Sequence, residues 1–438
     1  MTLTTPITVV RGRFLDIQKT VSQAQDIIDQ VRYIEDGVLI AKQGQIRWFG
    51  SWDDAQAHLP ANVEIQHYPE QLIIPGMIDT HIHFPQTEMV GAYGEQLLSW
   101  LNTYTFPTEI QFQDPSYAQK IAEFFIQELL KNGTTTALVF CTVHPESVDA
   151  LFEAAAQQQM RLIAGKVMMD RHAPEALCDT AESAYEDSKA LIGKWHGQGR
   201  ALYAITPRFA PTSTPEQLER AGQLKAEFPD VYVHTHLSEN KDEIAWVKDL
   251  FPEQKGYLDV YHHYGLTGNR SVFAHCVHLE DAEWQCMHET DSAIAFCPTS
   301  NLFLGSGLFP LKKTWQQQVK VGLGTDIGAG TSFSLLQTVN EAYKVQQLQG
   351  DKLSAFESLY HATLGGAKAL DLDNKLGNFN VGKEADFVVL NLKPTALQQL
   401  RQSRAKSLED SLFALFTMGD DRNIEATYIY GQKAYNQS

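Results

Sequence analysis

The chain has 438 residues, of which 43% are hydrophobic and 20% charged, so it is long enough for a large α/β domain and a smaller second domain. Asp and Glu outnumber Lys and Arg by 53 to 35, and the formal net charge of -18 argues against nucleic acid or an anionic membrane as a partner. The five cysteines are scattered, and no apolar run approaches the roughly 18 residues of a membrane span, so a reduced, cytoplasmic protein is expected.

Both ends of the chain contain short apolar runs separated by turns. Residues 37–41 and 45–49 flank a turn that contains Gly44, a pattern typical of a β-hairpin. Near the other end, residues 385–390 and 424–430 have the composition of strands. We therefore expect residues 1–72 and 376–438 to pair into one small β-sandwich domain built from both termini.

The middle of the chain, residues 73–375, alternates predicted strands with predicted helices. One helix is expected to begin after Asp114 as N-cap, with Pro115 at its first position, and to end near Gly133. The predicted strands are 73–79, 134–140, 161–169, 201–206, 231–236, 271–275, 292–296 and 319–325. Eight such units indicate an α/β fold, a (β/α)₈ TIM-type barrel.

Histidines stand at or near the ends of the predicted strands. His81 and His83 are two residues apart, so the alternation of a strand places both side chains on one face. Such a pair is a weak signal alone, but His236 follows on the fifth strand. Barrel sites lie at the carboxyl ends of the strands, so His236 is the better ligand and His234 is expected one layer deeper. Neutral imidazoles suit zinc.

Three further residues complete the predicted site. Glu239 is expected to shuttle protons, although an acid at a helix N-terminus is the alternative explanation. His275 ends the sixth strand and is expected to hold the attacking water by a hydrogen bond. Asp326 ends the eighth strand and is expected to accept a proton from that water. The predicted ligands of one Zn²⁺ ion per chain are His81, His83, His236 and Asp326. Such an ion would lower the pKa of bound water to about 7, and iron is an alternative metal for the same ligands.

These residues, in this order, resemble the amidohydrolase superfamily. The matches are the His-x-His pair after Pro-Gly-x-x-Asp-x, the histidines on the fifth and sixth strands, and the aspartate on the eighth. Residues 297–301 (CPTSN) and 304–307 (LGSG) are similar to its deaminase branch. The resemblance covers nearly the whole chain and implies a homodimer.

A narrower resemblance is to the guanine deaminase family. It is carried by residues 97–109 (LLSWLNTYTFPTE), 85–86 (PQ), 207–211 (PRFAP) and 236–240 (HLSEN). It implies hydrolysis of guanine to xanthine and ammonia. The implied substrate-binding residues are His83, Gln86, Arg208, Phe209, His236, Glu239 and Asp326. Arg208 suits a ring carbonyl oxygen, Gln86 can donate and accept at once, and Phe209 can pack on a ring face.

Other interpretations stay open at this point. Another mononuclear purine or pyrimidine deaminase, or a triazine chlorohydrolase of the same superfamily, is the nearest alternative. A non-catalytic barrel scaffold is the alternative from another class, although the complete ligand set argues against it. Binuclear amidohydrolases, which this chain also resembles, carry a bridging, carbamylated lysine on the fourth strand. The predicted fourth strand here, 201–206, has no lysine, so the resemblance implies one metal rather than two. Trp100, Tyr104 and Phe106 are candidates either for a lid over the pocket or for ordinary core.

Overall fold

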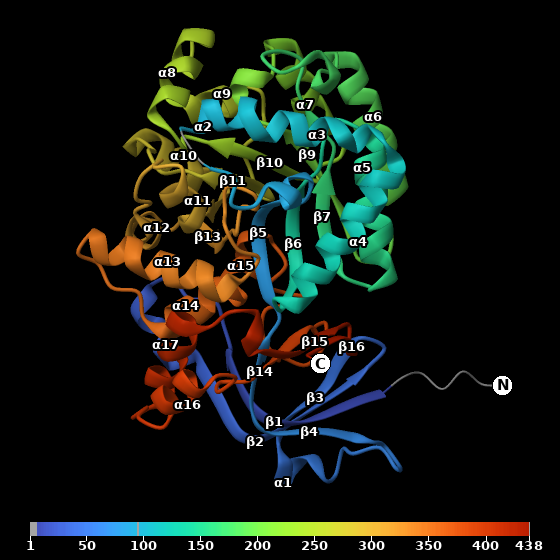
Figure 1. The fold of residues 1–438 in the computed structure, drawn as a ribbon, viewed down its shortest axis with the longest axis vertical. Helices are drawn as coiled ribbons and strands as arrows, with labels where there is room; N and C mark the ends of the chain where they lie inside the picture. The colour runs from blue at the N-terminus through green and yellow to red at the C-terminus, as the bar shows by residue number, and fades with distance from the viewer. Residues whose placement is uncertain (1–6, 94–95, 438) are drawn as a thin grey trace, which may run out of the picture.

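The computed structural model describes residues 7–93 and 96–437. Residues 1–6 of the predicted segment 1–72 and residue 438 of the predicted segment 376–438 lie outside this description. A barrel with its surrounding helices occupies the upper part of Figure 1, and a mixed sheet built from both ends of the chain lies below it. Within the described ranges, no helix has the length and apolar character needed to cross a membrane.

The barrel is formed by eight parallel strands that neighbour one another in chain order. They are β5 (Met77–His83), β6 (Thr134–Phe140), β7 (Arg161–Gly165), β9 (Ala201–Pro207), β10 (Tyr232–Leu237), β11 (Ser271–His275), β12 (Ala293–Phe296) and β13 (Lys320–Leu323). The backbone N–H of Asp326 donates to the carbonyl of His81 at 2.9 Å, and that of His83 donates to Ile327 at 2.9 Å. These bonds join the chain after β13 to β5, so the predicted TIM-type barrel is confirmed.

Two predicted strand boundaries were wrong. The expected strand 73–79 is two strands, because β4 (Ile65–Pro75) ends in the terminal sheet and β5 starts the barrel at Met77. Gly76 lies between them, where a Cβ atom would stand 2.0 Å from Oγ1 of Thr135, so only glycine allows this close passage. The expected strand 161–169 is interrupted after β7, and its end forms the short β8 (Val167–Met168) beside β9.

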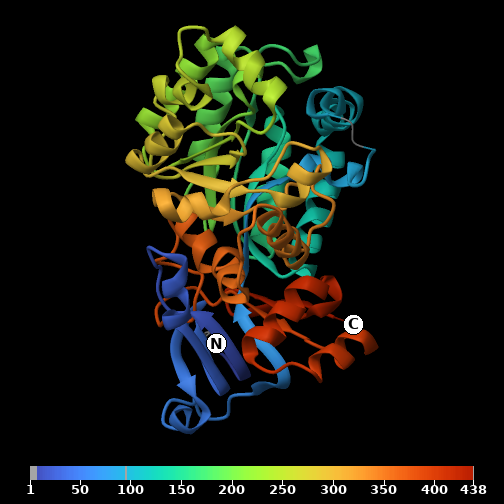
Figure 2. The same ribbon diagram turned by 90° about the vertical axis from the view of Figure 1, so that its left-hand side faces the viewer.

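Helices follow most of the barrel strands and surround the sheet (Figures 1 and 2). The predicted helix is α4 (Pro115–Lys131), and its N-cap Asp114 accepts a hydrogen bond from the backbone N–H of Ser116 at 2.9 Å. The others around the barrel include α5 (Pro145–Gln157), α6 (Ala181–Trp195), α7 (Pro215–Glu227), α8 (Lys241–Leu250), α9 (Tyr257–His263), α10 (Asp281–Glu289), α11 (Pro298–Phe303), α12 (Leu311–Gln317), α13 (Leu335–Leu348), α14 (Ala355–Ala362) and α15 (Leu364–Ala369). Three short helical segments, α2 (Leu97–Trp100), η3 (Leu101–Thr105) and α3 (Phe106–Glu109), connect β5 to this ring.

The strands from the two ends of the chain form one seven-stranded mixed sheet, in the order β16-β15-β14-β4-β1-β2-β3. Its members are β1 (Ile7–Ile17), β2 (Val31–Lys42), β3 (Gln45–Ser51), β4, β14 (Phe387–Leu390), β15 (Ile424–Ile429) and β16 (Gln432–Asn436). β14 pairs antiparallel with β4, which joins the C-terminal strands to the N-terminal ones. The predicted pairing of the two termini is therefore confirmed. α16 (Ala396–Gln402) and α17 (Leu408–Met418) lie between β14 and β15 in sequence.

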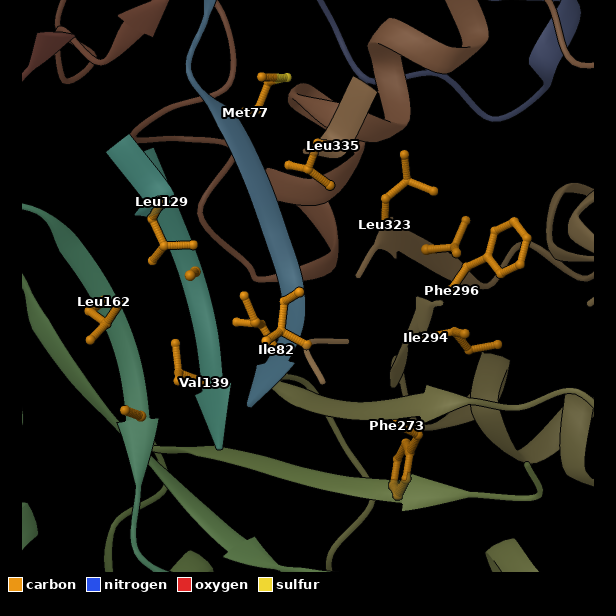
Figure 3. Close-up of a cluster of buried hydrophobic side chains, with 14 of the residues drawn as sticks. Met77, Ile82, Leu129, Val139, Leu162, Phe273, Ile294, Phe296, Leu323 and Leu335 are labelled. Atoms are coloured by element: carbon orange, nitrogen blue, oxygen red, sulfur yellow. The ribbon is translucent and has the colours of Figure 1, made fainter. Parts of the chain in front are cut away.

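The alternation of strand side chains separates the core from the site. On β5, Ile82 packs into the large apolar cluster between barrel and helices, together with Val139 and Leu162 of neighbouring strands (Figure 3). His81 and His83 flank Ile82 in sequence and therefore point to the opposite face, into the barrel. Burial of each large apolar side chain contributes about 1.5–3 kcal/mol, so the outward residues fix the strand while the inward ones are free for chemistry.

Candidate active site

Three histidines and one carboxylate converge inside the barrel. Nε2 of His81 lies 3.1 Å from Oδ1 of Asp326, and Nε2 of His83 lies 3.4 Å from the same oxygen. Nε2 of His236 lies 3.1 Å from Nε2 of His83. Ring nitrogens of His81, His83 and His236 form one group with metal-ligand spacing, and His81, His275 and Asp326 form a second. The four predicted ligands are thus brought together from β5, β10 and the end of β13.

The hydrogen bonds of these histidines leave nitrogen lone pairs turned toward one another. Nδ1 of His236 lies 2.6 Å from the carbonyl oxygen of Arg208, so it carries the proton and Nε2 carries the lone pair. Nε2 of His81, which faces Asp326, is buried without a hydrogen-bond partner, and Nε2 of His83 faces both Asp326 and His236. Burial lowers the pKa of His81, His83 and His236 well below the ordinary histidine value, which favours neutral imidazoles. Neutral imidazoles beside a carboxylate fit a divalent cation.

His234 lies deeper in the barrel, as the position of its strand predicts. Its Nε2 is 2.8 Å from Nδ1 of His81, and its side chain is fully buried. This contact occupies the second nitrogen of His81 and fixes the ring with Nε2 toward Asp326. Asp79 adds a second support, because its Oδ1 accepts the backbone N–H groups of both His81 and Thr325 at 3.1 Å. One buried carboxylate thus connects the ends of the first and eighth strands.

A second set of groups lies next to the metal-binding cluster. Oε1 of Glu239 accepts a hydrogen bond from Oγ of Ser306 at 2.9 Å, and its Oε2 lies 3.5 Å from Nε2 of His275. Nδ1 of His275 contacts Oδ1 of Asn301 at 2.9 Å, which turns Nε2 toward Glu239 and Asp326. Burial raises the pKa of Glu239 above the ordinary value, which favours the protonated carboxyl that a proton donor needs.

Opposing effects act on His275 and Asp326. Burial acts to lower the pKa of His275, but the carboxylates of Glu239 and Asp326 outweigh it and raise the pKa above the usual value. Burial raises the pKa of Asp326, against the influence of His275. Both residues adopt left-handed backbone conformations, with φ of 70° and 54°. Such conformations cost about 1–3 kcal/mol and are found preferentially at functional sites.

A small cavity opens onto these groups. Its lining includes His83, Gln86, Leu97, Trp100, Leu101, Arg208, Phe209, His236, Glu239, Glu243, His275, Leu304, Asp326 and Ala329. Every predicted substrate-binding residue is in this set, whereas His81 is fully buried below it.

The predicted lid residues separate into two groups. Trp100 lines the cavity and is buried, and its segment, α2, lies beyond the carboxyl end of β5 in the upper part of Figure 1. Tyr104 and Phe106 are not part of the cavity lining. The Phe106 ring instead packs against Arg208, with 5.6 Å between its centroid and the guanidinium carbon. Trp100 therefore forms part of the cavity wall, and Phe106 contacts a residue that lines it.

Three residues of the site have no predicted role. Asn301 and Ser306 hold His275 and Glu239, and both occur in the stretches 297–301 and 304–307 that carry the resemblance to deaminases. Glu109, at the end of the stretch 97–109, is fully buried and paired with Arg208. Motif membership was the available sequence signal for all three, but only the folded chain reveals their partners.

Comparison with known proteins agrees with this architecture. Residues 72–434 match the model of the amidohydrolase family. The chain is 62% identical to the guanine deaminase of Escherichia coli (strain K12) over 429 residues, which are 98% of each chain. The solved structure of E. coli guanine deaminase matches with a TM-score of 0.96 and 60% identity, covering 99% of this chain and 100% of that one. A guanine deaminase from C. acetobutylicum, solved with guanine bound in its active site, matches with a TM-score of 0.88 and 31% identity, covering 98% and 100%. The chain therefore belongs to the amidohydrolase family and, within it, to the guanine deaminases.

Proposed function

We propose that this protein hydrolyses guanine to xanthine and ammonia with one zinc ion per chain. The observation that carries the proposal is that Arg208 and Gln86, suited to a purine edge, line the same cavity as Glu239, His275 and Asp326. Membership of the guanine deaminases, one of which binds guanine in its active site, supports the substrate.

We assign the zinc ligands to His81, His83, His236 and Asp326. The buried, unpartnered Nε2 of His81 and the carboxylate that Nε2 of His81 and Nε2 of His83 share support this assignment. When bound, zinc supplies Lewis acidity, which makes a water molecule acidic enough to ionise near neutral pH. His234 and Asp79 keep His81 in position from below.

The reaction exchanges the exocyclic amine on a guanine ring carbon for an oxygen from water, and ammonia leaves. Asp326 accepts the proton that water loses, and Nε2 of His275 donates a hydrogen bond to the water oxygen. Glu239 protonates the ring nitrogen next to the reacting carbon and then helps move a proton to the departing amine. These assignments are supported by the proximity of the three side chains, 3.5 and 3.8 Å between His275 and the two carboxylates.

The pocket residues orient the purine. Arg208 offers guanidinium N–H groups to the ring carbonyl oxygen, which only accepts hydrogen bonds. The amide oxygen of Gln86 accepts the backbone N–H of Gly328 at 3.1 Å, which fixes the direction of the amide. Phe209, buried in the lining, packs on a face of the ring. Trp100 closes the cavity and helps exclude bulk water.

The proposal is tested by measuring ammonia release from guanine, adenine, cytosine and 8-oxoguanine, together with the metal content of the purified protein. We expect the kcat/KM for guanine to exceed the others by at least about 10²-fold, since a site built to hydrogen-bond its substrate rejects analogues that leave its polar groups unpaired. A kcat/KM for adenine or cytosine equal to that for guanine would reject guanine as the preferred substrate. The cytoplasmic location and the homodimer stay predictions, and sedimentation equilibrium checks the latter.

A further inference from the structure

A buried carboxylate joins the two residues that face the purine edge. Nη1 of Arg208 donates to both carboxylate oxygens of Glu109, at 2.9 and 2.8 Å. Nε2 of Gln86 donates to Oε1 of the same residue at 3.2 Å. Glu109 is fully buried and is not among the described residues that line the cavity, so it stands behind Arg208 and Gln86.

These contacts fix the orientation of both side chains. Gln86 has its amide oxygen on Gly328 and its amide nitrogen on Glu109, so the amide has one orientation. Arg208 is held by Glu109 on one side and by the Phe106 ring on the other. A guanidinium has five N–H groups, and the contact through Nη1 leaves those on Nε and Nη2 to meet a substrate. The carboxylate of Glu109 thus connects its own segment to those of Gln86 and Arg208, which are distant from one another in sequence.

The ion pair between Arg208 and Glu109 also controls the charge of the pocket. The side chain of Arg208 is 3% exposed and always protonated, so without a partner it would place a full positive charge beside the purine. The ion pair with Glu109 offsets that charge. A nearly neutral donor suits the carbonyl oxygen of uncharged guanine, whereas an unpaired guanidinium would attract an ionised purine. Xanthine, the product, loses a ring proton more readily than guanine because it carries two carbonyl groups.

We propose that Glu109 is a positioning residue that orients Arg208 and Gln86 and, by pairing the charge of Arg208, keeps the pocket selective for neutral guanine over anionic purines, including the ionised product. The inference rests on the proposed function, because it assigns guanine to this cavity. It assigns a role in substrate selection and product release to a residue that does not touch the substrate.

The test compares Glu109→Gln with the wild type and with Glu384→Gln as a matched control. Glu384 is also a glutamate paired with arginine, 13% exposed, accepting from Nε of Arg161 at 2.9 Å and Nη2 of Arg200 at 2.6 Å. Arg161 is the first residue of β7, so this pair lies at the opposite end of the barrel from the cavity. Xanthine and hypoxanthine are each used as inhibitors of guanine turnover, and the ratio of their two inhibition constants is the inhibition ratio. The buffer is mildly alkaline, so that xanthine is mostly anionic and hypoxanthine mostly uncharged.

In Glu109→Gln, the positive charge of Arg208 is no longer paired and attracts anionic xanthine but not uncharged hypoxanthine. We therefore expect xanthine to inhibit about tenfold more strongly relative to hypoxanthine, since such an attraction at an effective dielectric constant of about 20 is worth at least that factor. The KM for guanine should rise about 10-fold or more, because contacts to a charged group are lost. The Glu384→Gln variant should keep both wild-type values. An unchanged ratio of the two inhibition constants in folded Glu109→Gln overturns the inference.

A further variant makes the result independent of folding losses. Glu109→Asp keeps the charge but is too short to contact Arg208 and Gln86 together, so the KM should rise while the inhibition ratio stays that of the wild type. A changed ratio in Glu109→Asp contradicts the charge argument. Wild-type turnover of guanine reports separately on the proposed function.

Discussion

Replacing Glu239 with glutamine isolates proton transfer from the rest of the site. Glutamine has the same shape, and its amide oxygen can still accept the hydrogen bond that Oγ of Ser306 donates to Glu239 at 2.9 Å. The side chain should therefore keep its position with little change in folding free energy. It can no longer take up and release a proton, and the contact of 3.5 Å with His275 loses its charge.

The expected loss of kcat in Glu239→Gln follows from the loss of proton transfer and of the charge that faces His275. General acid–base catalysis by one side chain is typically worth about 10²–10⁴-fold in rate, or about 3–5 kcal/mol of activation free energy. Glu239 belongs to neither group of side chains with metal-ligand spacing, so the metal content should not change. We expect kcat to fall by about 10³-fold while KM changes little and one zinc per chain is retained.

Steady-state ammonia release, metal analysis and thermal unfolding together check this prediction. Glu283→Gln is the control, because Glu283 is a buried glutamate that caps α10 and accepts the backbone N–H of Leu258 at 2.9 Å, away from the cavity. Near-normal turnover in Glu239→Gln, or loss of its zinc, would refute the proton-shuttle role. A comparable loss of kcat in the control would show that removal of any buried carboxylate suffices.

The remaining predictions concern the supports of the site and of the fold. His234→Leu should weaken metal binding about 10–100-fold, because His81 loses its partner at 2.8 Å; competition with a chelator measures this, and unchanged affinity would contradict the supporting role. Asn301→Ala should lower kcat about tenfold with metal retained, because His275 loses the contact that orients it; wild-type kcat in this variant would argue against it. Prolonged chelation should abolish turnover, and added zinc should restore it, whereas activity that persists in metal-free protein would exclude a metal mechanism. Asp114→Ala should lower the free energy of unfolding by about 1 kcal/mol, measured by urea denaturation, and leave kcat/KM unchanged, since it removes only the N-cap of α4.

The local patterns of the sequence determined the elements and the direction of their side chains. Alternation along β5 and β10 was enough to place His81, His83 and His236 on the inner face of a barrel, because a strand repeats every two residues whatever surrounds it. Asp114 and Pro115 defined the start of α4 for a similarly local reason, since capping involves only the first turn. Gly76 separates the terminal sheet from the barrel, but the pattern of apolar residues runs through it, so the boundary between β4 and β5 was missed.

The tertiary structure alone decided which side chains support the chemistry. The partners of Glu109, Gln86 and Arg208, are 23 and 99 residues away along the chain, and Thr325 is 246 residues from Asp79. No repeat or spacing encodes such contacts, because closure of the barrel brings the ends of distant strands to one place. The sequence by itself determined that these residues exist at strand ends and within motifs. Their pairing, their burial and the resulting changes in charge and pKa arise only when the eight strands close around them.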